Sequence, residues 1–257
     1  MSAGTASAPG AGTPAAAEDA GLRMEGVTAG YLQHDVVLDD VTIEARSGKV
    51  TAVLGPNGSG KSTALRVLYG FLPPRVGRVT LDGRDVTGLA VDERLAAGIA
   101  FLPQGRSVFP RLTVEENLRL GAWRLRRRPA ELRAAVDRML ERYPTLAKLR
   151  EREAGSLSGG QARLLEFGRT LILDPAVVLV DEPSVGLAPV LVDEVYQELT
   201  RIKEEQRTVL LVDQNVRSAV ELADHVYTLA YGRNHLQGAK DQFTGRLDEL
   251  IKAWLQL

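Results

Sequence analysis

Short apolar runs alternate with amphipathic stretches along most of the chain. Three of these runs consist almost wholly of aliphatic and β-branched residues, at Lys49–Leu54, Val177–Val180 and Thr208–Val212. Such runs are typical of strands that are buried on both faces. Elsewhere apolar residues recur three or four positions apart and predict helices, the longest over Pro189–Gln206. Buried strands that alternate with helices indicate an α/β protein with a mostly parallel sheet.

The remaining elements are predicted from shorter patterns. Two strand-like runs, Leu22–Thr28 and Val36–Ala45, are separated by a Gly-Tyr turn and predict an antiparallel β region near the N-terminus. Further strands are expected at Arg78–Asp82, Ile99–Leu102 and Val226–Ala230. Further helices are expected at Ser62–Tyr69, at Val91–Ala97, from Ser158 to about Leu171, and at Ser218–Ala223.

The interval from Thr113 to Arg152 has helical patterning only. Pro129 and Pro144 stand where helices begin, a position that proline favours. Apolar residues recur along one helical face, at Leu132, Val136, Met139 and Tyr143. We therefore expect one domain over residues 21–257, with a helical subdomain inserted at about residues 105–160.

Composition excludes several classes of protein. The chain has no cysteine, so disulfides, thiolate metal sites and cysteine nucleophiles are excluded. Its 32 basic and 33 acidic residues argue against a protein that mainly binds phosphate backbones. Residues 1–20 are rich in Ala, Gly, Ser, Thr and Pro and lack the basic start and leucine-rich middle of a signal peptide. We expect them to form a disordered leader of a cytoplasmic protein.

The first buried strand leads into GPNGSGKS, which matches the phosphate-binding pattern G-x-x-x-x-G-K-[ST] between a strand and a helix. Glycines allow successive backbone N–H groups to point inward at phosphate oxygens, and the helix start adds its positive dipole end. The lysine would supply a charge to the β- and γ-phosphates, and the following serine is a candidate Mg²⁺ ligand. The candidate nucleotide contacts are Gly55, Pro56, Asn57, Gly58, Ser59, Gly60, Lys61, Ser62 and Thr63.

Two carboxylates end the second buried run, in VVLVDE. An acidic residue at the end of a strand beside a phosphate loop can hold Mg²⁺, a role that we assign to Asp181. Glu182 would then face the γ-phosphate and orient or deprotonate the attacking water. Strands often end in acidic residues at a solvent-exposed edge, so the two carboxylates alone are weak evidence for a Mg²⁺ site. The phosphate loop upstream makes this evidence strong.

A third motif, LSGGQ at Leu157–Gln161, opens the helix before VVLVDE. Taken alone, its serine is a helix N-cap and its glycines a flexible entry. The order of phosphate loop, helical insert, LSGGQ and VVLVDE resembles that of the ATP-binding cassette ATPases, from about Leu22 to the end of the chain. The resemblance implies that two cassettes face head to tail and sandwich ATP. The contacts to ATP held by the second cassette would be Ser158, Gly159, Gly160 and Gln161.

Other positions are carried over from this family one at a time. Tyr31 lies where an aromatic ring stacks on adenine, although a turn tyrosine that packs on the core is the alternative. Gln104 in FLPQGR matches a glutamine that reaches Mg²⁺ and relays the nucleotide state to the helical subdomain. Gln214 stands where most cassettes carry a histidine, and its amide can donate to phosphate but cannot carry a proton. The resemblance thus assigns catalysis to Glu182 and Gln214.

The runs Gly105–Leu118, Leu164–Pro175 and Asp181–Pro189 resemble the cassettes of branched-chain amino acid importers and of their urea and short-amide relatives. The glutamine at position 214 supports this subgroup. Two departures, Ala188 in place of an aspartate and glutamine rather than glutamate at position 104, leave urea-type transporters open. The changes near the site suggest that a cassette pair with unequal ATP sites forms.

The resemblance implies an ATP-hydrolysing subunit that uses ATP and Mg²⁺, with Mg²⁺ held by Ser62, Gln104 and Asp181. Its expected partners are integral membrane permease subunits, a second identical or different cassette and, indirectly, a solute-binding protein. We expect it on the inner face of the cell membrane, without a nucleic-acid partner. Non-transport ATPases of the family, which usually carry two cassettes or a long coiled-coil insertion, and phosphate-loop kinases are the other classes considered.

Three weaker features remain. Four arginines, Arg124, Arg126, Arg127 and Arg128, form a basic cluster, for which a solvated face is the ordinary explanation and anionic lipid or nucleic acid the alternatives. The histidines lie far apart and are not assigned to a metal. An amphipathic helix is expected at the tail, with apolar positions at Leu247, Leu250, Ile251 and Trp254.

Overall fold

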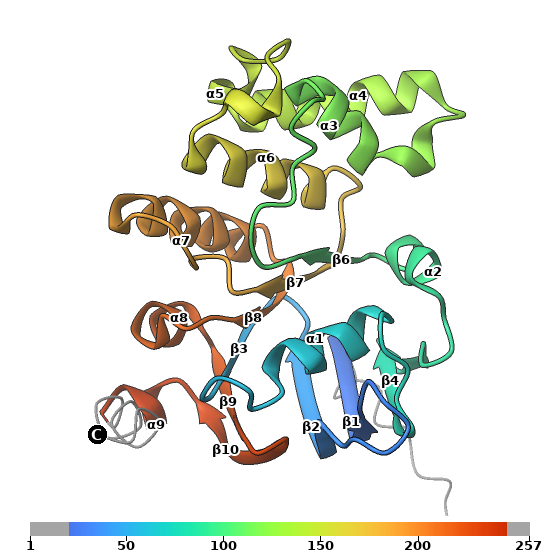
Figure 1. The fold of residues 1–257 in the computed structure, drawn as a ribbon, viewed down its shortest axis with the longest axis vertical. Coiled ribbons are helices and arrows are strands. Elements are labelled where there is room, and N and C mark those ends of the chain that lie inside the picture. Colours follow the sequence, from blue (N-terminus) through green and yellow to red (C-terminus); the bar gives the residue numbers. More distant parts are fainter. Residues whose placement is uncertain (1–20, 246–257) are drawn as a thin grey trace, which may run out of the picture.

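The computed structural model describes residues 21–245 (Figure 1). The leader over 1–20 and the expected tail helix from Leu247 lie outside the described residues. The strands are β1 Gly21–Ala29, β2 Leu38–Arg46, β3 Val50–Leu54, β4 Val76–Leu81, β5 Arg84–Asp85, β6 Ile99–Leu102, β7 Val177–Asp181, β8 Thr208–Val212, β9 His225–Ala230 and β10 Arg233–Ala239. The α-helices are α1 Lys61–Tyr69, α2 Val91–Ala96, α3 Val114–Gly121, α4 Pro129–Arg142, α5 Pro144–Ala147, α6 Gly159–Leu171, α7 Pro189–Glu204, α8 Val216–Leu222 and α9 Asp241–Thr244.

The strands form two sheets. A six-stranded sheet has the order β10-β9-β3-β8-β7-β6, and all of its neighbours are parallel except β10, which runs antiparallel to β9. A four-stranded sheet has the order β2-β1-β4-β5 and is antiparallel throughout. This architecture confirms the predicted α/β fold with a mostly parallel sheet and an N-terminal antiparallel β region.

The central strands separate two hydrophobic cores. On β3, Val50, Ala52 and Leu54 belong to the core that holds side chains of α6, α7 and α8, whereas Val53 belongs to the core under α1 and the antiparallel sheet. The neighbouring strand β8 divides its side chains in the same alternating way. Because successive strand residues point to opposite faces, a continuous apolar run fills both cores. Truncation of a leucine here to alanine costs about 2–5 kcal/mol.

The helices α3, α4, α5 and α6 gather at the end of the molecule away from the antiparallel sheet (Figure 1). The predicted helical interval is broken where a chain reversal is required. Gly121 ends α3 so close to α6 that a Cβ would lie 2.8 Å from the carbonyl oxygen of Arg169. Pro129 and Pro144 begin α4 and α5, as predicted from their preference for the first helical turn. The bounds of this subdomain remain a prediction.

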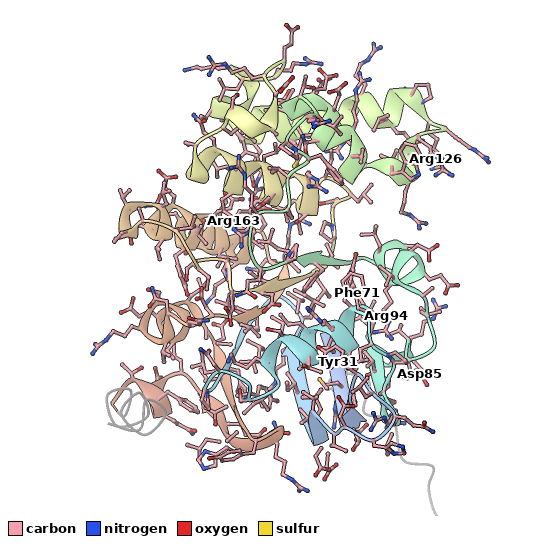
Figure 2. The ribbon with its side chains drawn as sticks, in the orientation of Figure 1. Tyr31, Phe71, Asp85, Arg94, Arg126 and Arg163 are labelled. Carbon is pink, nitrogen blue, oxygen red and sulfur yellow. The ribbon has the colours of Figure 1, made fainter. Side chains whose placement is uncertain are left out.

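One buried arginine joins α1 to α2. The Arg94 side chain is 1% exposed, and its guanidinium donates to the carbonyl oxygens of Val67 and Leu68 at 2.8 and 2.6 Å. These carbonyls lie in the last turn of α1, where an α-helix leaves carbonyl oxygens without their usual i+4 partners, and Val67 otherwise accepts only from the Gly70 N–H among the described backbone groups. The arginine therefore holds the end of α1 against α2 and places the aromatic residue that follows, Phe71, at the surface (Figure 2).

Three elements were not predicted. They are β5, the short α9 and β10, and the side chains of β10 are almost all exposed. An exposed edge strand lacks the alternation of apolar and polar residues that marks a half-buried strand. The hydrophobic pattern therefore does not predict β10 or its hairpin with β9.

Candidate nucleotide-binding site

The loop between β3 and α1 needs glycine at two positions. Gly55 has φ 149°, and a Cβ there would lie 2.2 Å from the carbonyl oxygen of Leu229 at the end of β9. Gly60 has φ 102°, and a Cβ would lie 2.7 Å from Leu38 Cδ2. The turn after β9 also supports the loop, because the Gly232 N–H donates to the Ser59 carbonyl oxygen at 3.2 Å. The loop is thus shaped by close approach to β9 and its turn.

The polar groups of this loop fit a polyphosphate. Lys61 is 4% exposed, and its Nζ donates to the carbonyl oxygens of Gly55 and Pro56, both at 3.0 Å. Burial lowers the pKa of Lys61, while the carboxylates of Glu182 and Asp181 oppose that shift. The Ser59 hydroxyl is buried and has no hydrogen-bond partner in the described part of the chain. The Lys61 ammonium group, which folds back onto the loop, and the unpaired Ser59 hydroxyl are both donors that could bind phosphate oxygens.

A hydroxyl and a carboxylate meet beside the loop. Ser62 Oγ donates to Asp181 Oδ1 at 2.9 Å, which joins the start of α1 to the end of β7. Burial raises the pKa of Asp181, and the hydrogen bond from Ser62 opposes the shift. Residues 21–245 contain no group of three or more His, Asp or Glu that could hold a metal. The pair fits Mg²⁺, which binds proteins through few oxygen ligands and keeps its other contacts to phosphate and water.

Glu182 follows β7 and is held by two amides. Gln104 Nε2 and Gln214 Nε2 both donate to Glu182 Oε2, at 2.6 and 2.8 Å. A carboxylate only accepts, so the NH₂ group of each amide faces it. Burial raises the pKa of Glu182, and Lys61 is the main opposing charge. The glutamate also has φ 43°, an uncommon conformation fixed by its N–H bond to the Val212 carbonyl oxygen at 2.7 Å.

The residues predicted from the sequence therefore meet on adjacent strands. Gln104 follows β6, Glu182 follows β7 and Gln214 follows β8, and these three strands are neighbours in the sheet. The carboxyl ends of parallel strands share one edge, which is where ligands bind in open α/β sheets. In this structure Gln104 contacts Glu182, and its contact to Mg²⁺ remains a prediction.

LSGGQ lies at the start of α6 and apart from the phosphate loop. Ser158 is the N-cap, its Oγ accepts from the Gln161 N–H at 3.2 Å, and Gln161 Oε1 accepts from the Ser158 N–H at 3.0 Å. Gly160 packs on α7, where a Cβ would lie 2.7 Å from Leu191 Cδ2. Within residues 21–245 no hydrogen bond joins residues 157–161 to residues 55–63. One chain alone does not bring the two motifs together.

The Tyr31 hydroxyl is held by hydrogen bonds, whereas much of the residue is exposed. Its hydroxyl lies 3.2 Å from Thr63 Oγ1 and accepts from Arg66 Nη1, also at 3.2 Å. The residue is 49% exposed, and the guanidinium carbon of Arg66 lies 5.7 Å from the ring centroid. The tyrosine thus projects from the loop after β1 beside α1. Its stacking on adenine remains a prediction.

Sequence reasoning did not single out a buried ion pair next to this site. Arg163 Nη1 donates to Glu166 Oε2 at 2.7 Å, and both residues are buried in α6. Glu166 also accepts from the Ser107 N–H, which fixes the loop that carries Gln104. Opposite charges three positions apart are common on exposed helix faces, so this spacing alone did not mark the pair.

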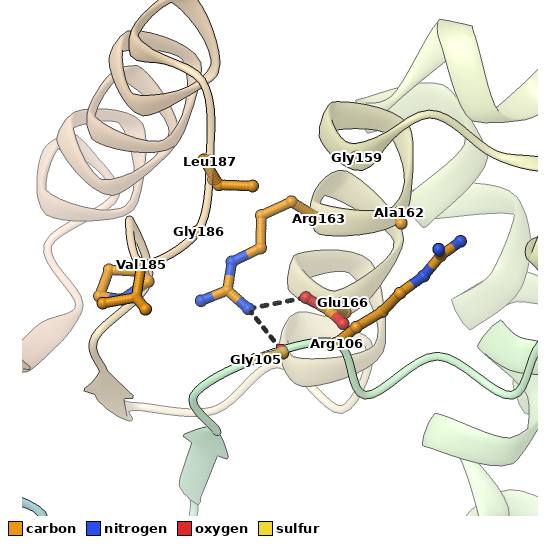
Figure 3. Close-up of a pocket in the computed structure, with 10 residues that line it drawn as sticks. Gly105, Arg106, Gly159, Ala162, Arg163, Glu166, Val185, Gly186 and Leu187 are labelled. Atoms are coloured by element: carbon orange, nitrogen blue, oxygen red, sulfur yellow. Dashed lines mark hydrogen bonds and ion pairs between the residues drawn. The ribbon is translucent and has the colours of Figure 1, made fainter.

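Arg163 also faces a cavity of about 250 Å³ (Figure 3). The cavity lies between α6, the loop at Gly105 and the segment Val185–Leu187 after Glu182. Within the described residues, Arg163 Nε and Nη2 are buried without a hydrogen-bond partner. The pair therefore joins α6 to the loop that carries Gln104, and its guanidinium faces the cavity that the segment Val185–Leu187 also lines.

The fold and site define a phosphate-loop nucleotide hydrolase. The chain belongs to the ABC transporter family, whose model matches residues 38–185. It is 38% identical over 196 residues to the high-affinity branched-chain amino acid transport ATP-binding protein BraG of Pseudomonas aeruginosa, covering 76% of this chain and 83% of that protein. It is 36% identical over 222 residues to the probable branched-chain amino acid transport ATP-binding protein LivF of Archaeoglobus fulgidus, covering 86% and 93%. The chain is thus an ATPase of the ABC type.

Other relatives and solved structures extend the comparison. The lipopolysaccharide export system ATP-binding protein LptB of Haemophilus influenzae is 31% identical over 233 residues, which cover 90% of this chain and 95% of that protein. The ADP conformation of MJ1267, an ATP-binding cassette of an ABC transporter, matches with a TM-score of 0.79 at 30% identity, covering 91% and 98%. A dimeric structure of MJ0796, a bacterial ABC transporter cassette, matches with a TM-score of 0.74 at 25% identity, covering 85% and 98%.

Proposed function

We propose that this chain hydrolyses MgATP to drive the import of branched-chain amino acids through separate permease subunits. The observation that carries the proposed hydrolysis is the convergence of Gln104 and Gln214 on one carboxylate oxygen of Glu182. The two relatives named for branched-chain amino acid transport support the solute. A urea or short-amide importer is the alternative solute class, and the export-system relative shows that similar cassettes are named for other cargo.

Each site residue has a chemical role in this proposal. Glu182 orients the attacking water and accepts its proton, while the two glutamine amides use one carboxylate oxygen and leave the other for the water. Lys61 binds the β- and γ-phosphates, and Tyr31 stacks on adenine. The Mg²⁺ ligands would be Ser62, Asp181 and Gln104, and the bound ion supplies positive charge to the phosphate oxygens.

A second cassette completes the ATP site in this proposal. The Ser158 side chain is exposed at the N-terminus of α6, and no hydrogen bond of the described residues ties LSGGQ to the phosphate loop. A helix N-terminus with a free face is suited to phosphate. The LSGGQ segment of one cassette would therefore contact the γ-phosphate held by the other, in a pair of identical or different chains. The dimeric cassette structure among the matches supports such pairing.

A groove beside the site offers a surface for the permease. Its volume is about 310 Å³, and it lies between the end of α1, α2, β6 and the helical group. Its aromatic wall consists of Tyr69 stacked on Phe101 at 5.3 Å and of Phe71, which is 56% exposed. Apolar grooves of this kind receive one face of an amphipathic helix. A helix of the permease would lie here, which keeps the chain on the inner face of the membrane.

No helix among the described residues has the length and apolar character needed to cross a bilayer. In this proposal the solute passes through the separate permease subunits, and a solute-binding protein is an indirect partner. A nucleic-acid partner is not part of this proposal.

Solute uptake in a strain that lacks this chain tests the proposed function. Leucine, isoleucine and valine uptake should fall and return with the wild-type gene but not with Glu182→Gln, whose amide cannot accept the proton of the attacking water. Urea uptake, measured in parallel, should be unchanged. Loss of urea uptake alone would move the proposal to the alternative solute class, and unchanged uptake of both would refute it.

A further inference from the structure

A basic and aromatic patch covers one corner of the helical group. It consists of Trp123, Arg124, Arg126, Arg127 and Arg128, which lie in the short 3₁₀ turn Trp123–Leu125 and the link to α4, and all five are exposed. Trp123 is 61% exposed, and the Arg126 guanidinium carbon lies 5.3 Å from its ring centroid. The whole chain carries a net charge of −1, so this excess of positive charge is local.

The patch borders the groove proposed for the permease. Gly121 lines that groove and lies two residues before Trp123. Arg124 Nη1 donates to the Asp92 carbonyl oxygen at 2.8 Å, and Asp92 lies in α2 three residues before Leu95, which also lines the groove. Arg126 and Phe71 lie toward the same flank of the molecule (Figure 2). The patch therefore lies beside the groove.

Among residues 21–245, no close acid neutralises most of the charge in the patch. Arg128 pairs with Glu131 at 3.3 Å, whereas Arg124 bonds to a backbone carbonyl and Arg126 to the Trp123 carbonyl oxygen. An exposed tryptophan among arginines has the composition of a membrane-interface anchor, because the indole ring prefers the headgroup region. Arginine guanidinium groups bind phosphate oxygens in a bidentate manner.

We propose that this patch binds the anionic phospholipid headgroups of the membrane that holds the permease. This inference rests on the proposed function, because docking of the permease in the groove turns this flank toward the bilayer. An acidic loop of the permease is the other conceivable occupant. Short cytoplasmic loops of membrane proteins are enriched in Lys and Arg, however, while the cytoplasmic leaflet is anionic. Charge complementarity therefore favours the lipid.

Sedimentation of the purified full chain with vesicles tests the proposal. Wild type should bind vesicles of phosphatidylcholine with phosphatidylglycerol, bind phosphatidylcholine alone weakly, and lose binding as salt is raised. Each basic residue near a charged surface contributes about 1 kcal/mol, or about fivefold in partition. The variant R126E/R127E/R128E should therefore lower partition by more than about tenfold.

The matched control is R84E/K148E/R152E, which reverses three exposed basic residues outside the patch and changes the net charge equally. The control should retain binding, and both variants should keep the basal ATPase rate and the melting temperature. A blue shift of Trp123 fluorescence on vesicle binding, read in a Trp254→Phe background, would place the indole at the interface.

Two outcomes would overturn the proposal. Equal loss of binding in the two variants would show that net charge rather than the patch is responsible. Retained vesicle binding in R126E/R127E/R128E, together with loss of ATPase stimulation by the detergent-solubilised permease, would assign the patch to an acidic permease segment. Vesicle binding is measured without permease or solute, so failure of the uptake experiment is distinguishable from failure here.

Discussion

At the scale of single residues, the environment of Glu182 sets the pH at which it can act as a base. Burial raises the pKa of Glu182, while Lys61 and the amide of Gln214 favour its charged form. A base with a raised pKa is protonated, and hence lost, as the pH falls through that value. We therefore expect the acid limb of kcat/KM for ATP hydrolysis to lie above the ordinary glutamate pKa of about 4.3.

Gln214→Leu removes one donor to the Glu182 carboxylate, so the pKa of Glu182 should rise further. The acid limb of the kcat/KM profile should therefore move to higher pH. The control is Gln197→Leu, an exposed glutamine of α7 whose loss should leave the profile unchanged. A profile that does not move in Gln214→Leu would show that the hydrogen bond does not tune the base.

The glycines of the phosphate loop give a second prediction at this scale. Gly60→Ala would place a Cβ 2.7 Å from Leu38 Cδ2 in a left-handed backbone, so it should abolish nucleotide binding and destabilise the fold by more than about 2 kcal/mol. Gly88→Ala meets nothing within 4 Å and should change stability by less than about 0.5 kcal/mol. Thermal unfolding and titration with a fluorescent nucleotide would test both variants. Tight nucleotide binding by Gly60→Ala would be inconsistent with a tightly packed loop.

At the scale of elements, two helices begin with the same cap and allow a matched comparison. Thr113 caps α3 together with Glu116, and Ser158 caps α6 together with Gln161, and both reciprocal hydrogen bonds are present in each cap. Thr113→Ala and Ser158→Ala should each cost about 1 kcal/mol of stability. Only Ser158→Ala should also lower the ATPase rate, because only this hydroxyl is proposed to meet phosphate. Equal ATPase rates in the two variants would show that the Ser158 hydroxyl acts only as a helix cap.

The buried pair Arg163–Glu166 is predicted to position the loop that carries Gln104. Removal of one partner leaves a buried charge and should cost about 3–5 kcal/mol, whereas Arg163→Met with Glu166→Leu should keep the fold. The double variant loses the Glu166 bond to the Ser107 N–H, so Gln104 is no longer fixed against Glu182. We expect kcat to fall by about tenfold to a hundredfold with KM for ATP little changed. Unchanged kcat in a stably folded double variant would exclude a positioning role.

The elements differ in how well the sequence predicts them. The buried strands and the phosphate loop are marked by adjacent residues, so their positions follow from local pattern. The exposed strand β10 has no such pattern. Contacts between elements depend on strand order, which periodicity does not encode. Family resemblance assigned roles to Gln104 and Gln214, but only the adjacency of β6, β7 and β8 shows both amides on one carboxylate oxygen.

At the scale of the whole molecule, the separation of LSGGQ from the phosphate loop predicts association. Glu182→Gln should block hydrolysis and leave nucleotide binding intact, so saturating MgATP should double the mass of this variant in light scattering. The partner would be a second copy of this chain or a companion cassette of different sequence. A matched sample with MgADP should stay monomeric, because ADP lacks the γ-phosphate that both cassettes contact. A monomer with MgATP, both alone and with the companion, would refute the shared site.

The shape of the phosphate loop depends on the turn after β9, which lies far away in the sequence. Gly232 bonds to the carbonyl oxygen of Ser59, and the end of β9 presses against Gly55. A fragment that stops before the hairpin of β9 and β10 would keep the glycine-rich motif but lose the residues that pack against it. During synthesis, the contacts that shape the glycine-rich loop are therefore complete only after this hairpin has been made.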